Sequence, residues 1–206
     1  MSPFAIFAVL AAYVWDGEAF GWDGTVADFV ADLFPVSSED VHVDPYVNGL
    51  AVVVTALVVA LALRLLSRRR LRAALFPVAA IGGAVLLSSL VKVVVQRPAI
   101  EGGEGDYSFP SGTATWSMAT AAAVVLLAGS VRLRWLLALA GAVLVLAYGA
   151  VITWEEWHYP SDVLAGWCLA LGWVTALWLA LLRPRWRVGS QASAARGSLP
   201  TSDPTA

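Results

Sequence analysis

A histidine and an aspartate four residues apart are the strongest candidates for chemistry in this 206-residue chain. His158 and Asp162 enclose the short sequence Tyr-Pro-Ser, and one helical turn would place both side chains on the same face. An aspartate bonded to one imidazole nitrogen fixes the tautomer and leaves the other nitrogen free as a nucleophile or base. The alternative is a surface histidine beside a helix-capping aspartate.

Two cations lie apart from the other basic residues. Lys92 interrupts an apolar run of leucine and valine, and Arg97 follows where that run ends. An ionisable side chain within an apolar span costs about 2.5 kcal/mol or more near the bilayer centre, and by default it marks a functional site. The alternative for Lys92 is snorkelling, in which the ammonium reaches the headgroups without a partner.

The third candidate is the sequence Pro-Ser-Gly at 110–112, which precedes another apolar run. Proline and glycine at a helix start leave backbone N–H groups free, and such a start binds anions. Ser111 and Gly112 are therefore candidate phosphate ligands, although an ordinary serine cap would have the same sequence. Two cations, a helix start and a His–Asp pair fit a tetrahedral anion attacked by histidine. Neither a metal nor a cofactor is expected.

Composition indicates a membrane protein. Hydrophobic residues make up 59% of the chain, charged residues 14%, and the mean hydropathy is +0.74. These values exclude a disordered chain and a nucleic-acid-binding protein with a basic face. Six apolar stretches are candidate spans: 3–15, 46–66, 73–96, 111–131, 135–153 and 163–182.

The first of these stretches is short and resembles a signal-peptide core without a basic start, but we interpret it as a first span. We expect an all-α polytopic membrane bundle of about six transmembrane helices, forming one domain over residues 1–187. Residues 188–206 are expected to be a disordered cytoplasmic tail. The single cysteine, Cys168, lies in an apolar run and is expected to be buried and unreactive.

Charge placement orients the bundle. With six spans, most of the 13 basic residues fall on one side and nearly all of the 15 acidic residues on the other. The positive-inside rule makes the basic side cytoplasmic. The candidate site then lies on the extracytoplasmic side of the plasma membrane, where Lys92 and Arg97 are the exceptional cations.

A segment at 23–35 is amphipathic. Its apolar residues recur at helical spacing, and Asp28 and Asp32 lie on the opposite face. This pattern predicts either a helix lying on the outer membrane surface or a helix packed over the mouth of the bundle.

At residues 46–182 the sequence resembles the type 2 phosphatidic acid phosphatase family of membrane lipid phosphatases, whose fold is shared with vanadium haloperoxidases. The motifs of that family are Lys-x6-Arg-Pro, Pro-Ser-Gly-His and Ser-Arg-x5-His-x3-Asp. Five residues match them: Lys92, Ser111, Gly112, His158 and Asp162. Arg97 stands two positions earlier than the arginine of the first motif. The resemblance implies that His158 forms a phosphohistidine, that Asp162 orients it, and that the other residues hold the phosphate.

The departures concern catalytic positions. Ala99 stands where the first motif has arginine, Thr113 where the second has its histidine, and Ile152 where the third has arginine. In the family, that histidine protonates the leaving group, and general acid catalysis is worth about 10²–10⁴-fold. Because a phosphate leaves readily without a proton, we expect a diphosphate substrate, with polyprenyl diphosphate the foremost candidate. Four acids are possible substitutes: Glu104, Asp106, Glu155 and Glu156.

Three functional hypotheses remain open. The first is a metal-independent lipid phosphatase or diphosphatase, for which the partners are a lipid phosphate and the bilayer and not a nucleic acid. The second is a catalytically degenerate relative that binds or carries a lipid phosphate without hydrolysing it, or that acts as a partner subunit. The third is a phosphotransferase using the same intermediate. A channel or transporter is disfavoured, because Lys92 alone lies within a span. The sequence sets no oligomeric state.

Overall fold

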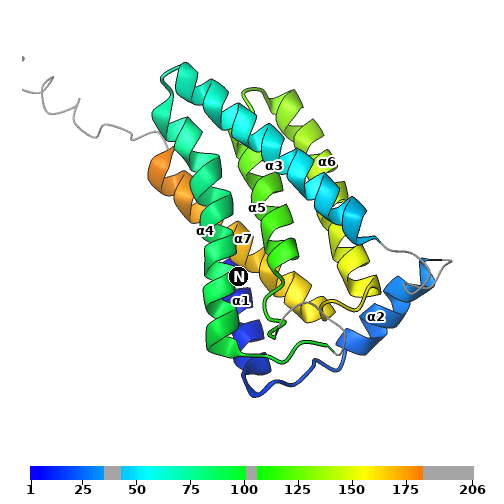
Figure 1. The fold of residues 1–206 in the computed structure, drawn as a ribbon. Helices are drawn as coiled ribbons and strands as arrows, with labels where there is room; N and C mark the ends of the chain where they lie inside the picture. The colour runs from blue at the N-terminus through cyan, green and yellow to red at the C-terminus, as the bar shows by residue number, and fades with distance from the viewer. Residues whose placement is uncertain (35–42, 101–105, 183–206) are drawn as a thin grey trace, which may run out of the picture.

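The computed structural model describes residues 1–34, 43–100 and 106–182. The sequence prediction of an all-α bundle is confirmed, and the described residues contain no β-strand (Figure 1). The helices are α1 (Pro3–Tyr13), α2 (Asp23–Asp32), α3 (Asp44–Ser67), α4 (Leu71–Val95), α5 (Gly112–Leu127), α6 (Val131–Trp154) and α7 (Pro160–Leu181). The expected tail at 188–206 lies outside the described residues.

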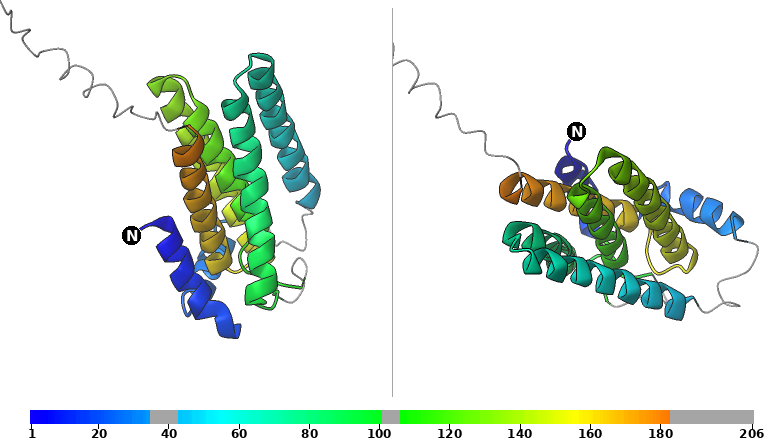
Figure 2. Two further views of the ribbon diagram at one scale, coloured as in Figure 1. Left: turned by 90° about the vertical axis from the view of Figure 1, so that its left-hand side faces the viewer. Right: turned by 90° about the horizontal axis from the view of Figure 1, so that it is seen from above.

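Four helices are long and apolar enough to cross a membrane: α3, α4, α6 and α7. The chain is therefore a membrane protein. Helix α5 has 16 residues, and α1 has 11, which corresponds to about 16 Å at ~1.5 Å per residue. Helix α1 runs beside one half of α7 (Figure 2), and a Cβ atom on Gly172 would lie 2.8 Å from the Phe4 ring. Of the six expected spans, α1 and α5 are thus the two that fall below the length of a full crossing.

Helix α5 lies at the centre of the bundle, between α4, α6 and α7. Its alanines contribute to a buried core that consists of Phe76, Ala80, Ala84, Ala119, Ala123, Ala170 and Val174. The alanines at five of these positions let the helix backbones approach closely, which is how helices associate where lipid removes the hydrophobic driving force. Cys168 is buried in α7, as expected.

One close approach joins α4 and α7. The indole of Trp173 lies against Gly83, and its Nε1–H donates to the carbonyl of Ala79 over 3.0 Å. A Cβ atom on Gly83 would lie 2.6 Å from the indole, whereas a Cβ on the neighbouring Gly82 would meet no atom within 4 Å. Position 83 therefore has no space for a side chain, whereas the adjacent position 82 does.

We expect Gly83→Ala to destabilise the protein by about 1–3 kcal/mol, because the indole must leave its place between the helices. Gly82→Ala is the matched control, and it should leave stability unchanged or raise it by up to about 1 kcal/mol through helix propensity. Thermal midpoints in one detergent measure both. Equal shifts for the two variants would contradict this account of the α4–α7 contact.

The bundle has two chemically different ends. The connections α3–α4 and α5–α6 form an arginine end, with Arg68, Arg69, Arg70, Arg132 and Arg134 in or beside them. The connections α4–α5 and α6–α7 meet at the opposite end, beside α2 (Figure 1). We call this the site end, because it carries every candidate site residue.

Helix α2 packs over the site end. Val26 and Val30 line a cavity of about 380 Å³ together with residues of α6 and α7. Phe34 stacks on Trp154, with ring centroids 4.7 Å apart. Of the two alternatives for this segment, the structure thus shows the helix packed over the bundle. Phe29, on the same predicted apolar face, is 63% exposed, so only part of that face is buried against the bundle.

Candidate active site

Helix α4 ends next to both candidate cations. Gln96 adopts the left-handed conformation with φ 53°, and Pro98 prevents the helix from continuing. Lys92, in the last turn, donates from Nζ to the carbonyl of Tyr107 over 2.8 Å. This contact ties the helix to the loop that leads into α5. Lys92 therefore lies at the end of the span, close to the start of the next helix.

The start of α5 is fixed by Ser111. Its hydroxyl accepts the N–H of Ala114 over 3.3 Å, and its own N–H donates to the carbonyl of Asp162 over 3.1 Å. The serine is fully buried and is the cap of this helix. Among the described residues, no acceptor lies against the N–H groups of Gly112 and Thr113. These two donors are available to an anion.

Gly112 and Thr113 line a cavity of about 290 Å³ at the site end. The rest of its wall comes from α3, α4, α5, α6 and the α6–α7 connection: Val47, Asn48, Ala51, Val85, Trp116, Tyr148 and Trp157. Trp157 directly precedes His158 in the chain. The cavity thus places a helix N-terminus beside the histidine-bearing connection.

The start of α7 carries the His–Asp pair. His158 Nδ1 lies 3.8 Å from Asp162 Oδ2, and both side chains are buried. The same Oδ2 accepts the N–H of Tyr159 over 3.3 Å, so the aspartate also caps the helix. Nδ1 is buried and has no hydrogen-bond partner among the described residues. The separation must shorten to ~2.8 Å for a hydrogen bond, as catalytic contacts often do when substrate binds.

The side chain of Arg97 is fully buried behind this pair. Nη1 donates to Asp162 Oδ1 over 2.5 Å and to the Ser161 hydroxyl over 2.9 Å. Nη2 donates to the carbonyl of Glu18 over 3.1 Å and pairs with Asp23 Oδ2 over 3.4 Å. The guanidinium also lies 4.0 Å from the centre of the Tyr159 ring. Both terminal nitrogens of Arg97 are thus engaged by protein groups.

A glycine holds α5 and α7 together at the site. A Cβ atom on Gly166 would lie 2.7 Å from the carbonyl oxygen of Ser111 and 2.9 Å from the hydroxyl of Thr115. The absence of a side chain at Gly166 allows the first turns of both helices to meet. It is this contact that brings Ser111 within hydrogen-bond distance of Asp162.

The three departures from the family motifs have different surroundings. Thr113 is half-buried and faces the 290 Å³ cavity. Ile152 is fully buried and packs with Ala114 and Val163, so an apolar cluster occupies the position of the second arginine. Ala99 is half-buried, and its N–H donates to the carbonyl of Asp106 over 3.3 Å.

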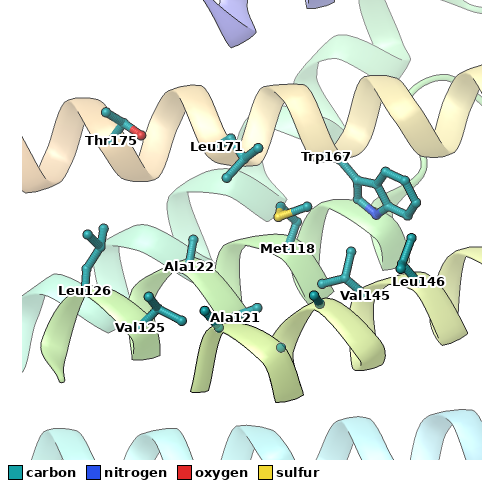
Figure 3. A pocket seen from close by; sticks show the side chains of 13 residues that line it. Met118, Ala121, Ala122, Val125, Leu126, Val145, Leu146, Trp167, Leu171 and Thr175 are labelled. Atoms are coloured by element: carbon teal, nitrogen blue, oxygen red, sulfur yellow. The ribbon is translucent and has the colours of Figure 1, made fainter. Parts of the chain in front are cut away.

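A larger cavity lies elsewhere. It has a volume of about 570 Å³ and opens between α5, α6 and α7, where Met118, Ala122, Val145 and Leu171 are part of its wall (Figure 3). Trp167 and Leu146 line both this cavity and the smaller one beneath α2. The wall of the 570 Å³ cavity is almost entirely apolar and includes none of the candidate site residues. The candidate site residues lie instead at the site end.

The structure gathers the predicted residues at one end but uses Arg97 in a way that the sequence did not indicate. Three residues without a predicted role take part in the hydrogen bonds and the cation–π contact around Arg97: Asp23, Tyr159 and Ser161. Asp23 is 2% exposed, although it belongs to an acidic segment without basic residues. Nothing in the sequence distinguishes it from the other acids of that segment.

Fold and site together define a helical membrane protein with a buried His–Asp pair and a helix start with free N–H groups at one end. Residues 73–186 match the sequence model of the PAP2 superfamily. The match covers more than half of the chain, and the protein belongs to this family, as its motifs predicted. A search of the curated proteins gives no match.

A solved structure supports the same fold. The chain is similar to a transmembrane PAP2-type phosphatidylglycerolphosphate phosphatase from Bacillus subtilis, with a TM-score of 0.60 and 17% sequence identity. The similarity covers 85% of this chain and 92% of the other. At this identity the likeness concerns the arrangement of the helices.

Proposed function

We propose that the protein hydrolyses the phosphate group of a membrane lipid, with His158 as the nucleophile. The observation that carries the proposal is the buried His158–Asp162 pair, which lies next to the free N–H groups at the start of α5. A protein that only bound a phosphate would have no need for an oriented imidazole. Membership of a family of membrane phosphatases supports the same reaction.

In the proposed reaction, the free imidazole nitrogen of His158 attacks phosphorus, and the bond from phosphorus to the leaving oxygen breaks. Water then attacks the phosphohistidine, which releases inorganic phosphate and restores the imidazole. Asp162 stabilises the positive charge that develops on the ring. Lys92 and the N–H groups of Gly112 and Thr113 would face the charge on the phosphoryl oxygens. Ser111 holds this helix start in place.

We propose a diphosphate as the preferred substrate, with a polyprenyl diphosphate as the foremost example. Thr113 supplies no acid for an alkoxide leaving group, and Arg97 is engaged by two carboxylates. A lipid monophosphate leaves with far less need of a proton. By the positive-inside rule the arginine end is cytoplasmic, so the site faces the outside of the cell membrane.

A second function is favoured by one observation. Ile152 lies in an apolar cluster where the family has an arginine, and this leaves fewer cations for the transition state. On this alternative, the chain binds a lipid phosphate without hydrolysing it. Transfer of the phosphoryl group from His158 to an acceptor other than water is a variant of the first proposal.

The test is phosphate release by the full chain in detergent, with a polyprenyl diphosphate and with phosphatidate. We expect release from the diphosphate that falls to background in His158→Ala. His42→Ala is the matched control, because the chain has two histidines, and it should retain the activity. Release that survives in His158→Ala would refute the histidine mechanism. Binding of radiolabelled lipid without release would establish the second function.

A further inference from the structure

Three buried charged groups form a chain behind His158. Arg97 lies between Asp162 and Asp23, and the side chains are at most 3% exposed. Two carboxylates and one guanidinium leave the trio with a formal charge of −1. A buried charge must be paired and hydrogen-bonded, and each of the three groups has such partners, although Arg97 Nε has none among the described residues. The arrangement concerns residues that the family motifs do not include, except for Asp162.

Asp23 belongs to the first turn of α2, outside the matched region 73–186. Its Oδ1 accepts the N–H of Ser161 over 2.8 Å. Its Oδ2 accepts the Ser161 hydroxyl over 2.8 Å and the N–H of Phe20 over 3.0 Å. Ser161 directly precedes Asp162 in the first turn of α7. The Asp23 carboxylate therefore anchors the turn that carries Asp162.

The two terminal nitrogens of Arg97 are divided between the two carboxylates. Nη1 binds Asp162 through Oδ1, whereas Nη2 is directed to Asp23 and the carbonyl of Glu18. An arginine with a single carboxylate partner commonly binds it with both nitrogens, one to each oxygen. Here that fork does not form, and Asp162 Oδ2 remains directed toward His158.

We propose that Asp23 is a positioning residue of the active site. By holding Nη2 of Arg97, it prevents the arginine from taking both oxygens of Asp162. Oδ2, which accepts the Tyr159 N–H, therefore stays accessible to His158 Nδ1. This inference rests on the proposed function, because it assigns Asp23 a part in orienting the nucleophile. Helix α2, which lies outside the family match, is then a component of the site rather than a cover over it.

The test compares Asp23→Asn with Asp28→Asn. Asp28 is exposed on the same helix and serves as the matched control. In Asp23→Asn the amide can still accept from Ser161 with its oxygen. Its NH2 group then faces two donors, the Phe20 N–H and Arg97 Nη2. We expect Arg97 to turn toward Asp162 and bind both of its oxygens.

Nitrogen-15 spectra of histidine-labelled protein measure the outcome without substrate. The chain has two histidines, so His42→Gln assigns the signals. In the unmodified protein at alkaline pH, we expect His158 to carry its proton on Nδ1, because that tautomer is the one Asp162 orients. Asp23→Asn should shift the population toward the Nε2–H tautomer, and Asp28→Asn should leave it unchanged.

Kinetics supply the second measurement. For Asp23→Asn we expect kcat to fall by about tenfold or more. This loss should be smaller than the ~10⁴-fold loss in kcat that follows when an orienting aspartate itself is removed. KM should change by less than about twofold, because Asp23 does not touch the substrate. Asp23→Glu keeps the charge and should recover part of kcat. A folding defect alone would lower the amount of active protein without changing the tautomer.

Two results would overturn the inference. The first is an Asp23→Asn protein that folds and in which His158 keeps the tautomer of the unmodified protein. The second is an Nε2–H tautomer of His158 in the unmodified protein itself. This second result needs no variant, so it applies even if Asp23→Asn does not fold. Because the spectra require no turnover, absence of phosphate release from every lipid would refute the proposed function separately from the tautomer result.

Discussion

Replacing Thr113 by histidine is expected to raise hydrolysis of a lipid phosphate monoester by about 10²-fold or more. The half-buried threonine faces a cavity of about 290 Å³, which leaves room for an imidazole beside the start of α5. An imidazolium there can protonate an alkoxide as it leaves, which a hydroxyl cannot do near neutral pH. Hydrolysis of a diphosphate should change far less, because its phosphate leaving group needs little proton transfer.

The measurement is the ratio of kcat/KM for phosphatidate to kcat/KM for a polyprenyl diphosphate. Thr113→Gln is the control, since glutamine has a comparable size and forms hydrogen bonds but provides no acidic proton. We expect it to leave the ratio unchanged. An equal gain on both substrates, or an equal gain from glutamine, would show that position 113 acts by shape and would contradict the leaving-group argument.

Replacing Arg97 by methionine is expected to have the largest effect on stability. The variant leaves the carboxylates of Asp23 and Asp162 buried without their cation, and breaking a buried ion pair costs about 3–5 kcal/mol. We expect a strong loss of folded protein in detergent. Arg68→Met, at an exposed position of the arginine end, is the control and should change stability by less than about 0.5 kcal/mol.

A double variant separates the ion network from simple loss of packing. Asp23→Asn combined with Arg97→Met removes one of the two orphaned carboxylates. It should therefore be no less stable than Arg97→Met alone, although each single change is destabilising. Thermal midpoints of all four proteins in one detergent give the coupling. Additive losses of stability would show that Arg97 and Asp23 contribute independently and that their ion pair has no coupling energy.

The bundle and the His–Asp pair could be predicted because both depend on local sequence. Apolar length defines α3, α4, α6 and α7, and a spacing of four residues places His158 and Asp162 on one turn. The end of α5 at Leu127 came earlier than expected, since Ala128 is already extended. Element boundaries depend on capping, which apolar composition does not reveal.

The partners of Arg97 could not be predicted, because they come from distant parts of the chain. Asp23 lies 74 residues before the arginine and Asp162 lies 65 residues after it. Asp23 also occupies the first turn of an amphipathic helix, where an acidic residue is common for local reasons. Its burial follows from the packing of α2 over the bundle, which composition alone does not specify.

The separation of these partners has a consequence for biosynthesis. Asp23 is translated before α3, whereas Ser161, which it binds, comes 138 residues later at the start of α7. Arg97 leaves the ribosome before Asp162 exists, and a nascent chain is built into the membrane from its N-terminal end. On the proposed function, His158 and the residues that position it therefore come together only when α7 packs against α2, after the residues of α3 to α6 have been made.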